Sequence, residues 1–154
     1  MLVKTPLGTF LLETSPKGLY AVRFPAIRRG QAVTSCLSPL LRKLCHAKLD
    51  LSGYAPFQKK VYTVLMKVPT GKTITYGELA GRSGYPGAAR AVGNAMKKNR
   101  LPIVIPCHRV VPSNGAVGDY SAGVKWKRWL LEYEKYSARL KITISKKQAP
   151  SKNQ

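Results

Sequence analysis

The chain has 154 residues, enough for one domain or two small ones, and 27 Lys and Arg residues against six Asp and Glu residues give it a formal net charge of +21. No apolar run reaches the roughly 20 residues that cross a bilayer, and the N-terminal residues lack the long apolar stretch of a secretory signal. We therefore expect a soluble, intracellular protein without membrane contacts. Six of the basic residues lie between 135 and 152, and without them 21 (27 less 6) still face six acids. The positive charge therefore belongs mainly to the folded part. It favours the interpretation that the protein binds nucleic acid over the interpretation that the charge serves only solubility.

The three cysteines, Cys36, Cys45 and Cys107, are too few and odd in number for a secreted disulfide scaffold. Cys36 and Cys45 could form a disulfide, or bind a metal together with His46. Two cysteines and an adjacent histidine supply only three ligands, however, in no familiar zinc spacing. We expect Cys36 and Cys45 to be buried or merely tolerated thiols and no metal to be bound.

Residues 1–27 alternate apolar and polar positions on either side of Pro16-Lys17-Gly18, which predicts a β-hairpin with room for a third strand. Residues 37–49 carry leucines at helical spacing. The sequence at 52–56 breaks this pattern. It predicts a boundary between an N-terminal domain (1–54) of sheet and helix and a C-terminal domain (55–138).

The C-terminal domain has helical periodicity over 57–68, ended by Pro69-Thr70-Gly71-Lys72. A short helix over 76–81 follows, with Thr75 as its N-cap. A glycine-containing turn at 84–87 then leads to a second helix over 88–98, rich in small and basic residues. Such a pair is typical of a helix-turn-helix, and together with the charge it favours DNA binding over plain packing.

An apolar segment bounded by prolines, 101–106, leads to Cys107 and His108, and a loop rich in glycine and small residues covers 117–123. Helical spacing returns from 124 to about 136, and we expect 139–154 to be a basic, disordered tail. The predicted fold is α+β, a small N-terminal sheet-and-helix domain followed by a mostly helical domain with a helix-turn-helix.

A thiol beside an imidazole is the beginning of an activated nucleophile, because the thiolate attacks and not the thiol. Neighbouring side chains on an extended chain point to opposite faces. Contact between Cys107 and His108 therefore needs a bent backbone, which Pro106 favours, or a bridging water. The pair alone favours a buried thiol next to a structural imidazole.

The wider sequence resembles the O6-alkylguanine-DNA alkyltransferases, also called methylated-DNA–protein-cysteine methyltransferases. Their active-site motif is similar to Pro106-Cys107-His108-Arg109-Val110, and the resemblance extends from about Phe57 to Glu134. It includes Phe57-Gln58, Thr75-Tyr76-Gly77-Glu78-Leu79-Ala80, Ala89-Arg90-Ala91-Val92-Gly93, Gly115, Gly118, Tyr120-Ser121 and Leu130-Leu131-Glu132-Tyr133-Glu134. Thr5-Pro6-Leu7-Gly8 and its hairpin resemble the family's smaller domain more weakly.

The resemblance implies that Cys107 accepts an alkyl group from O6-alkylguanine. His108 would draw the thiol proton through a water, and Glu134 would orient the imidazole, as in other triads. Asn99 corresponds to the family's hinge asparagine; it is equally suited to cap a helix C-terminus.

The family acts on duplex DNA from the minor groove and extrudes the damaged nucleotide, at a cost of a few kcal/mol. By resemblance, Arg90 fills the gap in the duplex, and Tyr76 crowds the target phosphate and donates a proton to N3 of the departing guanine. Tyr120 stacks on the base, Ser121 contacts O6, and Val110 and Met96 wall the pocket. The other residues implied at the DNA-binding helix are Ala89, Ala91 and Lys97.

The implied product is a thioether that no residue here can reverse, so each molecule would react once, without a cofactor. The family further implies a monomer in the cytoplasm, or in the nucleus of a eukaryote. Two residues depart from the family pattern. Ala122 stands where many members of the family carry glycine, and its methyl group would narrow the pocket and disfavour bulky alkyl groups. Asp119 would place an acid near the DNA.

Three other classes compete with this interpretation. Alkyltransferase-like proteins bind lesions without transfer, but they lack the motif cysteine that Cys107 supplies. A helix-turn-helix regulator leaves Cys107, Tyr120 and Ser121 unexplained. A cysteine hydrolase offers no reason for the DNA-binding half.

Overall fold

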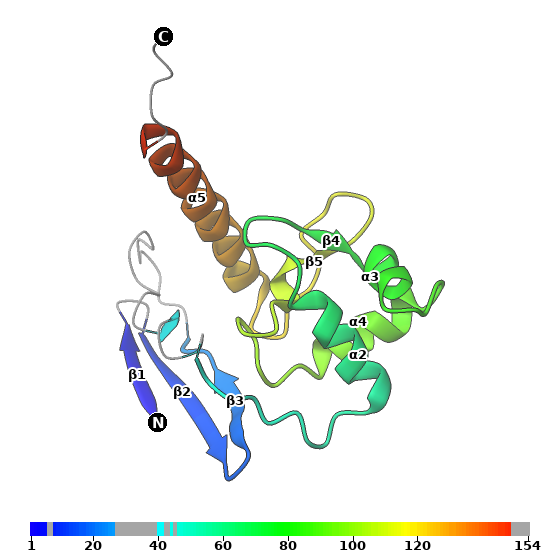
Figure 1. Ribbon diagram of the computed structural model, residues 1–154. Helices are drawn as coiled ribbons and strands as arrows, with labels where there is room; N and C mark the ends of the chain where they lie inside the picture. The colour runs from blue at the N-terminus through cyan, green and yellow to red at the C-terminus, as the bar shows by residue number, and fades with distance from the viewer. Residues whose placement is uncertain (6–7, 27–39, 42–43, 45, 149–154) are drawn as a thin grey trace.

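The computed structural model describes residues 1–5, 8–26, 40–41, 44 and 46–148, with the backbone alone for 139–148. Within these ranges, none of the helices has the length and apolar character needed to cross a membrane. An antiparallel sheet at the N-terminal end packs against a group of helices, and one long helix leaves the body (Figure 1). This is the predicted α+β arrangement. Cys36 and Cys45 lie outside the described residues, so the prediction for these thiols stays open.

The N-terminal sheet has the order β1 (Leu2–Thr5), β2 (Gly8–Ser15), β3 (Gly18–Arg23). It confirms the predicted hairpin and its third strand. The alternating apolar side chains share one buried face, as expected for a sheet with one face on the core. Gly18 follows the turn at φ +140°, and a Cβ there would lie 2.2 Å from the Lys48 carbonyl oxygen, so only glycine fits.

The predicted helix over 37–49 is only partly described. Leu40, Leu41 and Leu44 are helical, whereas 37–39, 42–43 and 45 lie outside the described residues. Its predicted C-terminal end is wrong, because Leu49 forms a bridge to Leu19 of β3. The Leu19 N–H donates to the Lys48 carbonyl at 2.7 Å. Pairing with the sheet therefore overrides the helical spacing of the leucines.

The helical part begins with α2 (Pro56–Leu65) and continues through β4 (Ile74–Thr75), α3 (Tyr76–Arg82) and α4 (Ala89–Lys97). After α4 come a 3₁₀ turn, η1 (Cys107–Arg109), β5 (Val110–Val111) and α5 (Val124–Gln148). Strands β4 and β5 pair in parallel, which brings the residues just before α3 beside those just after Cys107. The three helices predicted between 57 and 98 are confirmed, each within about three residues of its expected ends.

Sheet and helices share a continuous core. Phe10 of β2 and Phe24 pack edge-on against Trp126 in the first turns of α5, with ring centroids 5.7 and 4.9 Å away. The Trp126 indole N–H donates to the Pro25 carbonyl at 3.2 Å. Aromatic pairs of this geometry add to the free energy gained from burial. The sheet and the residues that follow it thus pack against α5, the helix that carries Glu134, and stabilise its position.

Helix α5 continues to Gln148, well past the predicted end near residue 136 (Figure 1). The expectation of a disordered tail is therefore wrong for 139–148, whose backbone is helical, and 149–154 lie outside the described residues. The thinning of the apolar pattern does not end the helix, because residues 124–148 contain neither Gly nor Pro and many are good helix formers.

Candidate active site

The two short helices form a hairpin whose first member begins at a capping box. The Thr75 hydroxyl accepts from the Glu78 N–H at 3.2 Å, and the Glu78 carboxylate accepts from the Thr75 N–H at 2.8 Å. This confirms Thr75 as the N-cap. Leu79 of α3 and Val92 of α4 are fully buried and hold the helices together.

The outer face of α4 carries the residues predicted to meet DNA. Arg90, Ala91 and Lys97 are exposed, and Ala89 is half-buried. Positions 90 and 97 are seven residues apart, which places their cationic side chains on one face of the helix. That face is free of acids, since α4 contains none.

Cys107 begins the 3₁₀ turn η1, directly after Pro106, so the backbone bends where the sequence predicted a bend. Its side chain is only 4% exposed. The Asn99 amide donates to the Cys107 sulfur at 3.1 Å. Burial raises the pKa of the Cys107 thiol, and the hydrogen bond from Asn99 opposes that shift. The resting thiol is therefore protonated at neutral pH, and it needs a base before it can attack.

Asn99 ties together the segment that leads to the cysteine. Its amide nitrogen donates to the Ile105 carbonyl at 2.9 Å, and its amide oxygen accepts from the Leu101 N–H at 2.9 Å. Helix α4 is capped by Lys98, so Asn99 stands one residue beyond the helix. Its side chain bonds forward to the loop and not back to the helix, which fits the hinge prediction better than the capping alternative.

His108 is 1% exposed, and its Nε2 lies 2.8 Å from Oε1 of Glu134 on α5. An ionised carboxylate can only accept a hydrogen bond, so Nε2 carries a proton. Nδ1 is buried and has no hydrogen-bond partner among the described residues.

Glu134 is the centre of a buried polar network. Arg109 donates to both of its carboxylate oxygens, with Nη2 2.7 Å from Oε1 and Nε 3.0 Å from Oε2, and the Gly71 N–H donates to Oε2 at 3.1 Å. Burial alone would raise the pKa of Glu134, but the hydrogen bonds from His108 and Arg109 outweigh it and lower the pKa to about 2. The carboxylate therefore stays ionised at any physiological pH.

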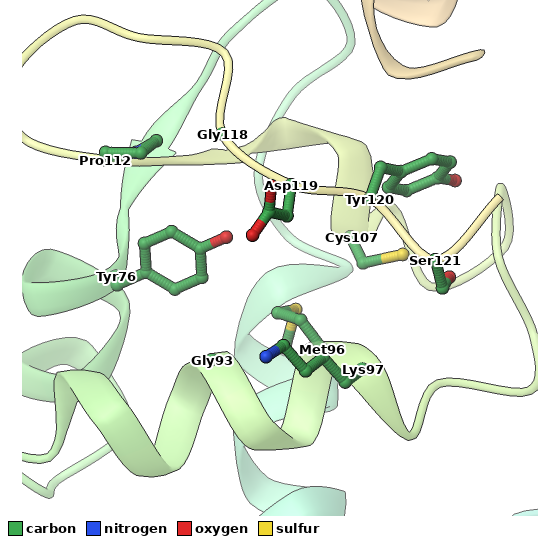
Figure 2. A pocket seen from close by; sticks show the side chains of 10 residues that line it. All are labelled: Tyr76, Gly93, Met96, Lys97, Cys107, Pro112, Gly118, Asp119, Tyr120 and Ser121. Atoms are coloured by element: carbon green, nitrogen blue, oxygen red, sulfur yellow. The ribbon is translucent and has the colours of Figure 1, made fainter. Parts of the chain in front are cut away.

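The thiol faces a cavity of about 470 Å³ between α4 and the 118–121 loop. Figure 2 shows Tyr76 and Asp119 toward one end of this pocket and Cys107, Tyr120 and Ser121 toward the other, with Met96 and Lys97 on the α4 wall. A purine base fits a site of this size, since ligand pockets start at about 300 Å³. Tyr76, Met96, Tyr120 and Ser121 are brought together around Cys107, as the resemblance implied.

Val110 is the one predicted wall residue that lies outside the described lining of the pocket. It is fully buried in β5, where it pairs with Ile74 of β4. Its carbonyl accepts a hydrogen bond from Nζ of Lys127 at 2.7 Å. The strand pairing turns its side chain into the core.

The pKa values of the two tyrosines of the pocket, Tyr76 and Tyr120, are both raised. Burial and, to a lesser extent, the nearby Asp119 carboxylate raise the pKa of Tyr76. Burial raises the pKa of Tyr120 well above its usual value, and the neighbouring Cys107 adds to this. Both phenols therefore keep their protons at neutral pH, and the buried Tyr120 hydroxyl has no hydrogen-bond partner among the described residues.

Two residues of the site were not predicted. Arg109 lies in the quoted motif, but its bond to Glu134 depends on a helix that begins 15 residues later. Lys127 is fully buried, and its Nζ donates to the carbonyls of Val110 and Asp119 at 2.7 and 3.3 Å, joining β5 to the pocket loop. Its spacing of three and seven residues from Leu130 and Glu134 could have placed it on the inner face of α5.

Comparisons with known proteins show the family to which the chain is related. Residues 56–136 match the family described as 6-O-methylguanine DNA methyltransferase, DNA binding domain. The methylated-DNA–protein-cysteine methyltransferase of Salmonella typhimurium is 48% identical over 85 residues, 55% of this chain and 50% of that protein. The protein of the same name from Mycobacterium tuberculosis is 45% identical over 97 residues, 63% of this chain and 58% of that protein. The chain thus spans about half the length of the curated relatives it matches.

The fold agrees over a longer stretch than the sequence. The crystal structure of Mycobacterium tuberculosis OGT in complex with DNA has a TM-score of 0.71 to this chain at 33% identity, and it covers 88% of this chain and 91% of that one. The family match itself takes in 81 of the 154 residues (56–136). The chain belongs to the 6-O-methylguanine DNA methyltransferase family.

Proposed function

We propose that this protein repairs DNA by transferring the alkyl group of O6-alkylguanine to its own Cys107. The observation that carries the proposal is the position of this thiol. It faces a base-sized pocket, and the next residue, His108, is oriented by the buried carboxylate of Glu134. The family's characterised members have names that describe such an activity, and we extend it to this chain as a proposal.

The proposed step is a displacement at carbon. Nδ1 of His108 takes the thiol proton through a water, the Cys107 sulfur bonds to the alkyl carbon, and the bond from that carbon to O6 breaks. Tyr76, whose phenol stays protonated, donates a proton to N3 of the departing guanine, because an anionic guanine is a poorer leaving group. The step leaves an imidazolium at His108 and a phenolate at Tyr76, and the proton passes from one to the other through solvent, so the step needs no metal or cofactor. The thioether on Cys107 remains, so each molecule reacts once.

We assign the remaining predicted residues to binding. Tyr120 would stack on the flipped base and Met96 would pack on its other side, while Ser121 would contact O6. The backbone around Cys107 and Val110 would read the base edge. Asn99 would hold the thiol, since its amide already donates to the sulfur.

The proposed partner is duplex DNA that carries O6-alkylguanine, approached from the minor groove by a monomer. Arg90 and Lys97 on the exposed face of α4 would meet the duplex, with Ala89 and Ala91 allowing close approach. Residues 55–138 would bind DNA and react, and residues 1–54 would support them. The site of action is wherever the cell keeps its DNA, the cytoplasm or, in a eukaryote, the nucleus.

The rival with the same DNA-binding surface is a protein that binds lesions without transfer. A transferring protein and this rival differ in the number of alkyl groups that become attached to each protein molecule. Mixing the protein with excess duplex containing O6-[³H-methyl]guanine should attach one label per protein molecule and then stop. Label found on the Cys107 peptide by mass spectrometry supports transfer.

A duplex with labelled methyl at another base position is the matched control and should leave the protein unlabelled. Label that stays on DNA despite tight binding would favour the alkyltransferase-like rival. Several labels released per protein molecule would contradict the single-use mechanism.

Arg90→Ala should slow transfer from duplex DNA by about ten- to a hundredfold, because the extruded nucleotide loses the side chain that replaces it in the stack. Reaction with the free base O6-benzylguanine needs no extrusion and should change less than about twofold. Single-turnover rates with both substrates measure the difference. Lys60→Ala, which removes an exposed cation from α2, is the control. Equal losses on the two substrates would contradict the role of Arg90.

A further inference from the structure

Arg100 directly follows Asn99 and occupies the junction between the N-terminal sheet and the loop that leads to the active site. Its guanidinium lies between two aromatic rings, 4.1 Å from the ring centroid of Tyr20 on β3 and 4.2 Å from that of Tyr54. Its Nη2 also donates to the Ser52 carbonyl at 2.8 Å. A cation held over two ring faces is attracted by both. Two segments distant in sequence, β3 and residues 52–54, thus converge on one side chain.

The backbone of Arg100 is held on both sides as well. Its N–H donates to the Tyr54 hydroxyl at 2.7 Å, and its carbonyl accepts from the Val22 N–H of β3 at 2.8 Å. Tyr54 is itself buried against Tyr62 of α2, with ring centroids 4.9 Å apart. The residue after Asn99 is therefore anchored to the sheet and, through Tyr54, to the first helix of the C-terminal part.

The segment after Arg100, residues 101–105, has a strained backbone that the contacts of Arg100 help to hold. Residues 101–105 form a tight turn, closed by the Ile105 N–H donating to the Leu101 carbonyl at 2.8 Å. Within it Ile103 has φ +75°, a left-handed backbone conformation that is strained for a β-branched residue. Asn99 bridges the two ends of this turn and donates to the Cys107 sulfur. Because strained backbone persists only where its surroundings hold it, the anchor at Arg100 and the bridge at Asn99 act together.

We propose that Arg100 is a positioning residue for the transfer reaction: by clamping the chain between Tyr20 and Tyr54 it holds the Asn99 amide against the sulfur of Cys107. The role in transfer rests on the proposed function. The contacts of Arg100 with Tyr20 and Tyr54, which we call the clamp, can be tested without DNA. A loosened Asn99 donates less well to the sulfur. Since that hydrogen bond favours the thiolate, the thiol then becomes harder to ionise.

The experiment measures the rate at which iodoacetamide alkylates Cys107, from pH 6 to 10, by mass spectrometry of the Cys107 peptide, which separates it from Cys36 and Cys45. Arg100→Ala should move the midpoint of this profile to higher pH and slow the reaction at neutral pH by about tenfold. Single-turnover transfer should slow by at least about tenfold, because misplacing a reacting group has effects of this order. Arg100→Lys keeps a cation between the rings and should recover part of both losses.

Tyr54→Phe removes only the hydroxyl that accepts from the Arg100 N–H, so it tests the clamp in a protein that keeps its ring packing. It should shift the profile in the same direction, by less. Arg128→Ala, an exposed arginine of α5, is the matched control and should leave the profile unchanged. If Arg100→Ala and Tyr54→Phe lower the thermal midpoint but leave the thiol profile in place, Arg100 only joins the two parts of the fold and the proposal is wrong. A shifted profile in a protein that transfers no alkyl group would uphold the clamp and overturn the proposed function alone.

Discussion

Cys107→Ser should abolish alkyl transfer, with a rate more than about a thousandfold below that of the unchanged protein. A serine hydroxyl has nearly the shape of the thiol, so the pocket and the contact with Asn99 survive. It is a far weaker nucleophile, however, because its pKa lies well above that of a thiol that already needs His108 as a base. The loss is therefore chemical and not structural.

Binding is the control for this prediction. The affinity for duplex DNA, measured by fluorescence anisotropy, should change by less than about twofold, because the predicted duplex contacts of Arg90 and Lys97 lie on α4 and the substitution keeps the backbone of η1. Cys36→Ser and Cys45→Ser should both transfer at the normal rate. Stoichiometric labelling that persists in Cys107→Ser would move the acceptor to one of those thiols and contradict the mechanism.

Glu134→Gln should weaken both folding and transfer. The carboxylate accepts hydrogen bonds from His108, Arg109 and Gly71, and a neutral amide leaves the Arg109 guanidinium without a counter-charge at this buried site. Breaking a buried ion pair from one side costs about 3–5 kcal/mol of unfolding free energy. Transfer should fall by about a hundredfold, because His108 loses the anion that orients it and stabilises its protonated form.

The same carboxylate makes stability depend on pH. Its pKa is about 2 in the folded protein against 4.5 in the unfolded chain. Its stabilisation, about 3 kcal/mol for a shift of this size, is therefore complete above pH 4.5 and is lost as the pH falls from there toward 2. Urea unfolding of the unchanged protein at pH 7, 4.5, 3.5 and 2.5 measures the loss.

Glu134→Gln should flatten this part of the profile, because the amide does not titrate. Glu132→Gln is the matched control, since Glu132 is an exposed acid two residues earlier on α5 and should leave stability and slope unchanged. An identical acid profile in Glu134→Gln and the unchanged protein would contradict the assigned pKa. Asp50, whose pKa is also lowered to about 2 by hydrogen bonds from Ser15 and Ser52, remains in both proteins and cancels in the comparison.

The elements whose hydrogen bonds and burial are local were predictable from the sequence. Alternation over 1–27 is a direct consequence of a sheet with one buried face, and Thr75 with Glu78 forms a capping box within four residues. The two failures have different causes. Leu49 leaves the predicted helix because it pairs with Leu19, a non-local contact, whereas α5 continues to Gln148 because its residues include many good helix formers and neither Gly nor Pro.

By itself the sequence determined the charge, the helix-turn-helix and the motif around Cys107, because each depends on residue type and short spacing. Only the tertiary structure decided which nitrogen of His108 faces Glu134, since that contact joins residues 26 positions apart. The same holds for Arg100, which has no motif of its own and draws its place from Tyr20, Tyr54 and Ser52. Contacts between residues distant in sequence depend on how the helices and strands pack together. The spacing of residues close in sequence does not predict that packing.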